Sequence, residues 1–542
     1  KYSAGWNKYL LGSYEQNEDG SYSYTTNRVG NEVSTDLNST NETAGDRRIY
    51  LEAMVDYNRT FGRHDVNAML LYNQDELVNN VPGNNLINSL PKRKQGLAGR
   101  LSYAYDGKYM AEVNMGYNGS ENFAKGHRWG FFPSIALGYN ISEESFFEPL
   151  RKVITSMKLR GSWGLVGNDQ IGGERFIYMP TINLSGKGFT TGIDQNYGLS
   201  GPVYTRYENN SITWEVGEKI NLGIDLQLLN SLNIVVDIFR ETRRDIFQKK
   251  GTIPTYLGTG NTDVFGNLAE MKNQGLDLSI DYNKAFSKDF YMNFKGTFTY
   301  AHNEITKYDE APKYAFQSKV GQSANVSQGY LSNGLFLDEA EIDRYNQQMG
   351  STLGAGDIKY LNVSNMHGYG DDIVDVDDWT WIGNPTVPEI VYGFGPSFKY
   401  KNWDFSFFFQ GVAKTSLFMS GFHPFGDNSL RNVLQFVAND RWSPTNQNVD
   451  AKYPRLTRKT SLNNTNPGNS GRTSDYWMRD GSFLKLKNME LGYTFKRMRF
   501  YISGSNLLTF SKFDLWDPEQ GGGSGLKYPT QRVFNVGFQM TF

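Results

Sequence analysis

The end of the chain alternates between apolar and polar side chains. From Phe534 to Phe542 every second residue is apolar, and the residues between them are asparagine, glycine, glutamine and threonine. Successive side chains of an extended chain point to opposite faces, so this segment has one apolar and one polar face. Such a strand is typical of a β-barrel that crosses a membrane, with lipid outside and a wet lumen inside.

Segments with the same alternation recur along the chain in pairs. A very short polar turn joins the two segments of each pair, and one turn is Asp106-Gly107, a dipeptide that adopts positive φ at low cost. The short connections lie near residues 63, 107, 230, 287, 402 and 497, and those between them are long: 166–210, 248–267, 303–387, 416–479 and 513–529. Outer-membrane barrels have short periplasmic turns and long extracellular loops, so this order predicts about sixteen antiparallel strands, the last running down to the periplasm.

The composition excludes several other classes. The chain of 542 residues has no run of about 18 apolar residues, so no helix in it can cross a bilayer. Its 34 tyrosines and 35 phenylalanines suit the aromatic girdles of a membrane barrel. The absence of cysteine excludes disulfides and thiol catalysis, and a net charge of −2 without a basic block argues against nucleic acid as a partner. The predicted fold is therefore an all-β transmembrane antiparallel barrel, surrounded by outer-membrane lipid.

The pattern divides the chain into two parts. Residues 1–47 are rich in Asn, Ser, Thr and Gly, and we expect one strand around Tyr2 to Tyr14 followed by a long polar outer loop. Residues 48–542 are expected to form barrel strands with long extracellular loops, with a short helix between Ser142 and Thr155.

Two segments predict which side chains face lipid. One apolar series is expected to face lipid and the polar residues between its members to face the lumen: Ile220, Leu222, Ile224 and Leu226 against Asn221, Gly223, Asp225 and Gln227. Between Phe483 and Phe495 the apolar positions change from even to odd numbers. That change of phase requires a β-bulge near Lys487-Asn488.

Three aromatic residues are candidates for a function. Phe542 ends the last strand, and we expect it to be the assembly signal read by the machinery that inserts barrels. Trp379 and Trp381 lie in a long outer loop. Two interpretations stay open for them: anchoring at the membrane interface, or a substrate-binding platform on which sugar rings or side chains stack in an outer vestibule.

The stretch from Asp371 to Asp378 is dense in carboxylates. Asp371, Asp375 and Asp378 are candidate calcium ligands, because calcium prefers several oxygen ligands at short spacing. The stretch lacks the complete Asp-x-Asn-x-Asp-Gly loop, so a solvated acidic turn is the favoured interpretation. The histidines have no ligand spacing and predict neither a metal centre nor histidine-based catalysis: His64, His127, His302, His367 and His423. We expect no cofactor and no enzymatic activity.

Several motifs resemble those of one transporter family. The segment KLRGSWGLVGN at 158–168 is similar to a strand motif of TonB-dependent transporters. Further motifs resemble the SusC family of Bacteroidetes: GDIKY at 356–360, IGNP at 382–385, YGF at 392–394, FFQG at 408–411, DGSFLKLKN at 480–488, SGSNLLTF at 503–510, DPE at 517–519 and YPTQR at 528–532.

The resemblance covers the chain from about residue 47 and matches only the C-terminal part of such a transporter. It implies a 22-stranded barrel, of which about six strands and the plug belong to sequence that precedes this chain. It also implies import of oligosaccharides or peptides with a SusD-like surface lipoprotein, driven by TonB through the plug region. The expected partners are therefore this lipoprotein, TonB, the substrate and the N-terminal remainder of the transporter.

Two other functions stay open on the residues alone. A passive porin would need a constriction loop and a barrel that closes on itself. An outer-membrane enzyme would need a histidine with serine or aspartate at the outer rim. His127 is the histidine close to the outer start of a strand, and no serine motif accompanies it.

Overall fold

The structure is a computed structural model. It describes residues 2–3, 8–29, 38–39, 45–80, 89–171, 175–254, 256, 263–345, 347–348, 353–422, 425, 433–457, 464 and 473–542. Within these residues, no helix combines the length and the apolar character that a membrane span requires. His423 lies outside the described residues.

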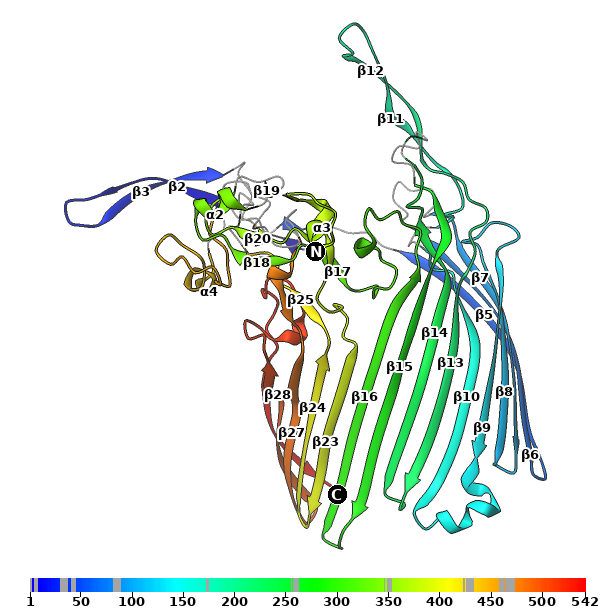
Figure 1. Ribbon diagram of the computed structural model, residues 1–542. Helices are drawn as coiled ribbons and strands as arrows, with labels where there is room; N and C mark the ends of the chain where they lie inside the picture. The colour runs from blue at the N-terminus through cyan, green and yellow to red at the C-terminus, as the bar shows by residue number, and fades with distance from the viewer. Residues whose placement is uncertain are drawn as a thin grey trace.

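Fifteen strands of the described chain form one antiparallel sheet, a tilted wall in Figure 1. Along the sheet the strands follow chain order: β5 (Asp46–Phe61), β6 (His64–Asn79), β7 (Lys92–Tyr105), β8 (Tyr109–Ser120), β9 (Trp129–Asn140), β10 (Ile154–Asn168), β13 (Glu215–Leu228), β14 (Leu232–Lys249), β15 (Phe265–Ala285), β16 (Phe290–Lys307), β23 (Ile390–Tyr400), β24 (Trp403–Ala413), β27 (Phe483–Phe495), β28 (Met498–Ser511) and β29 (Val533–Met540). The all-β antiparallel fold is thus confirmed.

The wall has one strand fewer than the sequence pattern predicts. The strand expected near Tyr2 to Tyr14 is present as β2 (Lys8–Gln16), but it pairs with β3 (Tyr22–Val29) in a separate hairpin. The turn explains this pairing, because Gly20 takes φ 82° and the Asp19 carboxylate accepts a hydrogen bond from the Ser21 backbone at 2.9 Å. A partner a few residues away closes a hairpin at a small entropic cost, which favours it over the distant wall.

The two ends of the wall differ as the connections predict. At one end the turns are short, and several residues in them have positive φ, among them Asp106, Gly107, Asn230 and Lys401. The predicted helix near residue 142 appears as two 3-10 helices, η1 (Ile141–Glu143) and η2 (Ser145–Leu150). At the other end lie the long loops, so Figure 1 shows the short turns with the C-terminus below and the loops above.

The predicted bulge is confirmed at Lys487. On one side, Leu486 pairs with Phe409 and Asn488 with Phe408, which leaves Lys487 as the extra residue. The register with β28 shifts at the same point. The extra residue turns the following apolar side chains back to the lipid face, which is the phase change seen in the sequence.

The two outermost strands of the wall do not pair with each other. Within the described chain, β5 pairs with β6 and β29 pairs with β28, so each leaves one edge of backbone N–H and C=O groups without a strand partner. All residues of β5 are exposed. An unpaired edge in hydrocarbon costs several kcal/mol for each unsatisfied group, so both edges require a neighbour in the membrane.

The last strand also leads to a test of the assembly signal. Phe542 is 97% exposed and follows the end of β29, so its ring contributes little to the stability of the fold. Deletion of Phe542 is nevertheless expected to lower the inserted amount several-fold, because we predict that the aromatic end is the signal read by the insertion machinery. The measurement is the heat-modifiable, folded band in purified outer membranes. Phe542→Trp, which keeps an aromatic end, should retain the wild-type level, and an unchanged level in the deletion would contradict the assignment.

The remaining elements lie in the loops. They are β1 (Tyr2–Ser3), β4 (Asn38–Ser39), β11 (Thr181–Thr191), β12 (Tyr197–Arg206), η4 (Ala315–Gln317), β17 (Ser327–Gly329), β18 (Ser332–Leu335), α2 (Glu339–Arg344), β19 (Gln347–Gln348), β20 (Ile358–Tyr360), α3 (Val363–Met366), β21 (Ile373–Val374), η5 (Val376–Asp378), β22 (Thr380–Ile382), β25 (Ser416–Phe418), α4 (Gln435–Asn439), η6 (Asp475–Trp477), β26 (Met478–Asp480) and η7 (Pro518–Gln520). Figure 1 shows the β11–β12 hairpin extending away from the wall.

Three loops together build an outer-loop domain, which we define as the described residues of 308–389, 414–482 and 512–532. Short sheets join two of the loops internally: β17 pairs with β22, β18 with β20 and β25 with β26. Single bridges, Tyr330 with Ser474 and Met419 with Gly523, connect different loops. Apolar side chains from all three loops meet in one buried cluster, including Tyr330, Tyr360, Phe422, Trp477 and Phe513. The main hydrophobic core of the described chain therefore lies in its outer loops, while the wall exposes its apolar face to lipid.

Candidate functional site

Charged side chains define the lumen face of the wall. Arg160 on β10 donates hydrogen bonds to Asp225 on β13 at 3.1 Å and to Asp237 on β14 at 2.6 Å. Gly223 lies opposite both Arg160 and Asp237 in the register. Gly223 and Asp225 therefore lie on the polar face, and Leu222, which is 63% exposed, lies on the lipid face, as predicted.

Similar pairs line the lumen face elsewhere. Arg100 contacts Glu112 at 2.7 Å, and Arg499 contacts Glu490 at 2.5 Å and also Asp404. Each pair joins neighbouring strands or strands separated by one. The lumen face of the described wall thus carries arginines and carboxylates that are paired with one another.

The two candidate tryptophans both lie in the outer-loop domain. Trp381 is on β22 and donates from Nε1 to the Ser318 carbonyl at 2.8 Å, which fixes its ring against the neighbouring loop segment. Trp379 is 36% exposed and meets Tyr330 edge-on, with ring centroids 5.9 Å apart. Trp379 has the more accessible ring, and a stacking role for either residue stays a prediction.

An aromatic column beside these residues was missed in the sequence. Phe316 stacks on His367 with centroids 4.6 Å apart, and Tyr314 meets Phe316 at 5.5 Å and Tyr369 at 4.1 Å. His367 and Tyr369 are exposed. The only sequence signal is the spacing of two aromatic rings with one residue between them in each segment, which is common in strands of this chain. The column adds exposed ring surface to the outer-loop domain.

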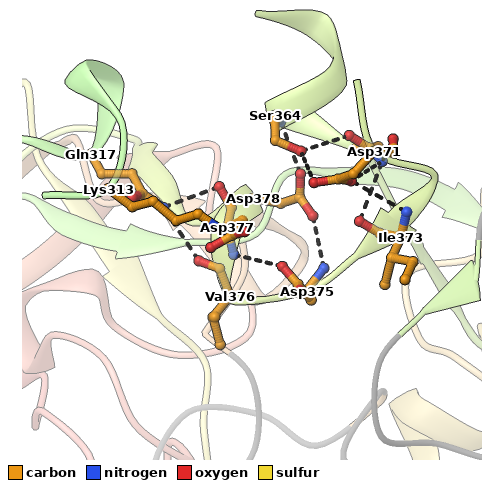
Figure 2. Close-up of polar contacts among 10 residues, drawn as sticks. Lys313, Gln317, Ser364, Asp371, Ile373, Asp375, Val376, Asp377 and Asp378 are labelled. Atoms are coloured by element: carbon orange, nitrogen blue, oxygen red, sulfur yellow. Dashed lines mark hydrogen bonds and ion pairs between the residues drawn. The ribbon is translucent and has the colours of Figure 1, made fainter. Parts of the chain in front are cut away.

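The acidic stretch folds into a tight, hydrogen-bonded turn (Figure 2). Asp375 caps η5 by accepting from the Asp377 backbone at 2.8 Å, and Asp378 returns a bond by accepting from the Asp375 backbone at 2.7 Å. Asp378 also accepts from the Ser364 backbone at 2.9 Å, while Asp371 accepts from the Ser364 hydroxyl at 3.1 Å. Asp377 forms an ion pair with Lys313.

The pKa values of two of these carboxylates are shifted in opposite directions. Burial raises the pKa of Asp378 in spite of its hydrogen bonds from Ser364 and Asp375. At Asp371 burial also raises the pKa, but hydrogen bonds from Asn362, Ile373 and Ser364 outweigh it and the pKa lies below its usual value. Across the described chain, no group of three acidic or histidine side chains has the arrangement of a metal site. Calcium binding by Asp371, Asp375 and Asp378 stays a hypothesis.

Three of the sequence motifs hold the outer-loop domain together and connect it to the wall. Asp357, from the GDIKY motif, is fully buried and forms an ion pair with Arg455, and it accepts from Asn464 at 2.6 Å. Lys485, from the DGSFLKLKN motif, is buried and pairs with Asp517 and, at 2.8 Å, with Glu519 of the DPE motif. Lys487 reaches the same Glu519 at 2.6 Å. These residues thus position the loops over the end of the wall.

His127 is the histidine that an enzymatic site at the outer rim would use. His127 is exposed in the loop between β8 and β9, and in the described part of the chain its ring makes no hydrogen bond to a serine or an aspartate.

Comparison with known proteins identifies the family that has this architecture. Residues 1–507 match the family model described as TonB dependent receptor-like, beta-barrel. The chain belongs to the TonB-dependent receptor β-barrel family. It is therefore an outer-membrane β-barrel protein, and its family is one of transport receptors and not of enzymes.

Individual relatives agree with this assignment. The chain is 25% identical to TonB-dependent receptor P3 of Formosa agariphila, over 95% of this chain and 54% of the relative, and 28% identical to TonB-dependent receptor SusC of Bacteroides thetaiotaomicron, over 82% and 43%. The resemblance to SusC proteins is confirmed. The structure of the RagAB peptide transporter aligns with a TM-score of 0.66 and 20% identity, covering 92% of this chain and 56% of that chain. The chain thus spans about half the length of the relatives it matches.

Proposed function

We propose that this chain forms the barrel wall and outer loops of a TonB-dependent importer that takes up oligosaccharides or peptides across the outer membrane. The observation that carries the proposal is the combination of a charged lumen face with a packed outer-loop domain at one end of the wall. A pore for free diffusion needs no such domain. Membership in the TonB-dependent receptor family supports the same function.

The proposed partners follow from the parts of the surface that need a neighbour. The free edges of β5 and β29 would pair with strands of the N-terminal remainder of the transporter, which would also supply the plug that TonB pulls. Amides of β5 on the edge away from β6 should then be protected from hydrogen exchange in the whole protein, and fast exchange there would contradict the pairing. A SusD-like surface lipoprotein would close over the outer-loop domain, with the tryptophans and the aromatic column on the side available to substrate or lipoprotein. Co-purification of that lipoprotein after mild detergent extraction tests this contact.

The rival functions find less support. A self-contained porin needs a barrel closed by its own first and last strands, and β5 and β29 are not paired in the described chain. A hydrolase of the outer-membrane type needs a serine nucleophile and a histidine that activates it, and the histidine in turn needs a carboxylate to orient it. The exposed ring of His127 has no such neighbours in the described chain.

Uptake by whole cells tests the import function. A strain without the gene is expected to stop removing either oligopeptides of a tryptic digest or oligosaccharides of a partial glycan hydrolysate from the medium, as followed by mass spectrometry. Restoring the gene should restore uptake, and a protonophore should abolish it, because TonB depends on the proton gradient of the inner membrane. Consumption of both mixtures at the wild-type rate by the deletion strain would refute importer function. Uptake that persists with the protonophore would instead support a passive pore.

A further inference from the structure

A pocket of about 250 Å³ opens on the lumen face directly below the outer loops. Three neighbouring strands form its floor, where Glu241 of β14 lies opposite Asn273 of β15, and Asn273 lies opposite Asn303 of β16. We call it the rim pocket. These positions share a face with Asp237, which belongs to the lumen face because it pairs with Arg160.

Outer-loop residues complete the rim pocket. Asn303 accepts hydrogen bonds from the Ser323 hydroxyl at 3.0 Å and from the Ala324 backbone at 2.8 Å, which holds the segment 323–325 at its edge. The Asn325 carbonyl accepts from the Thr386 backbone at 3.0 Å, which joins the segment that carries Val387. The walls of the pocket are thus fixed by hydrogen bonds to the scaffold.

The charged groups that line the rim pocket are Arg243 and the carboxylates of Glu241 and Glu389. Arg243 donates from Nε to Glu241 at 3.0 Å and lies 3.5 Å from Glu215, yet 45% of its side chain stays exposed. An arginine already oriented by two carboxylates loses little entropy on binding another anion, and its remaining N–H groups suit a carboxylate. The exposed part of Arg243 is therefore suited to an anionic ligand group.

The other lining groups determine what else the ligand carries. In the described chain the side-chain amide of Asn273 makes no hydrogen bond, so it can both donate to and accept from a ligand. Met271, Ala301 and Val387 supply an apolar surface beside it. No aromatic ring lines the pocket, whereas sugar rings are commonly held by stacking on aromatic faces. A ligand that complements this pocket carries a carboxylate, a hydrogen-bonding amide and an apolar group. The C-terminal end of a peptide has all three.

We propose that the rim pocket binds the C-terminal residue of a short peptide, with Arg243 holding the terminal carboxylate, Asn273 the last peptide group and Met271 with Val387 the side chain. The inference rests on the proposed importer function and narrows its substrate class to peptides. The carboxylate of Glu389 takes no part, because it contacts His302 at 2.5 Å and Lys414 at 3.5 Å.

Titration calorimetry on the detergent-purified protein tests the proposal, with trialanine and C-terminally amidated trialanine as probes. Amidation and Arg243→Gln are each expected to weaken trialanine binding at least tenfold. The two changes together should weaken it no further, because both remove the same contact. Arg100→Gln, which removes another lumen arginine paired with a carboxylate, should bind as the wild type does. Heat-modifiable migration of each variant confirms that it is folded.

Other outcomes would overturn the assignment. Equal affinities for trialanine and its amide, or an Arg243→Gln variant that binds normally, would show that the rim pocket does not hold the carboxylate. Weakening by Arg100→Gln would place the site lower in the lumen. Tighter binding of trigalacturonate than of trialanine would identify an acidic glycan as the ligand. Since calorimetry does not depend on TonB or on a lipoprotein, failure here with normal uptake in cells would reject the pocket and leave the importer function standing.

Discussion

Leu222→Arg is expected to remove most of the folded protein from the outer membrane. Leu222 lies in the middle of β13 with 63% of its side chain exposed, and its register neighbours on the lipid face are Gly161 and Ile238. An arginine on the lipid face near the membrane midplane costs about 2–4 kcal/mol. Insertion of the strand requires this charge to enter hydrocarbon. A free-energy cost of that size should lower the folded fraction at least tenfold.

The matched control lies one residue away. Asn221→Arg places the same side chain on the lumen face, and the heat-modifiable band should stay near the wild-type level. Gly223 also faces the lumen but is a poor control, because a Cβ there would lie 2.6 Å from Arg160 Cζ and 2.8 Å from Asp237 Oδ1. If Asn221→Arg proved more harmful than Leu222→Arg, the faces assigned to β13 would be inverted.

The wall could be predicted from the sequence because each of its strands obeys a local rule. Because one face of each strand contacts lipid and the other the lumen, apolar and polar residues alternate along it. A short turn must follow where the chain reverses direction. The bulge at Lys487 could be located for the same reason, since a single extra residue exchanges the two faces. Such features need no knowledge of what lies on the neighbouring strand.

The outer-loop domain could not be predicted in this way. Its core brings together Tyr330, Phe422, Trp477 and Phe513, which come from three loops separated by barrel strands. Contacts between segments so far apart leave no period in the sequence. The rim pocket shares this origin, because Arg243 and Asn273 are on the wall but Val387 arrives from a loop. The strand β2 was wrongly assigned to the wall for the opposite reason, because the alternation of a strand does not specify which strand it pairs with.

The family-like motifs became interpretable only with the structure. Asp357 and Lys485 look like ordinary surface charges in the sequence, yet both side chains are almost completely buried. Each is paired with a charge distant in the chain, Arg455 in one case and Asp517 with Glu519 in the other. These residues thus mark where the loops are held to one another and to the wall.

The burial of Asp357 leads to the second large expected effect. Asp357→Ala should unfold the outer-loop domain locally while the wall stays inserted. The carboxylate accepts from Arg455, from Asn464 at 2.6 Å and from the Gly354 backbone at 3.0 Å, so its removal leaves a half-buried guanidinium and a buried amide without their acceptor. Breaking a buried pair on one side typically costs about 3–5 kcal/mol. Because loops open locally at a smaller free-energy cost than the whole fold, a loss of this size is expected to open the outer-loop domain.

Proteolysis of intact cells measures this opening. Trypsin should cleave the outer loops of Asp357→Ala at least tenfold faster than those of the wild type, while the heat-modifiable barrel band keeps its intensity. Asp372→Ala changes an exposed carboxylate of the same domain and should be cleaved at the wild-type rate.

A double variant separates charge burial from loss of shape. If the cost arises from an uncompensated buried charge, replacing both partners with apolar side chains in Asp357→Leu/Arg455→Met should recover part of the resistance, because no guanidinium is then left unpaired. Recovery would assign the larger share of the effect to the charge. Cleavage as fast as in Asp357→Ala would show that the bonds to Asn464 and the Gly354 backbone, which the double variant also lacks, are what hold the loops closed.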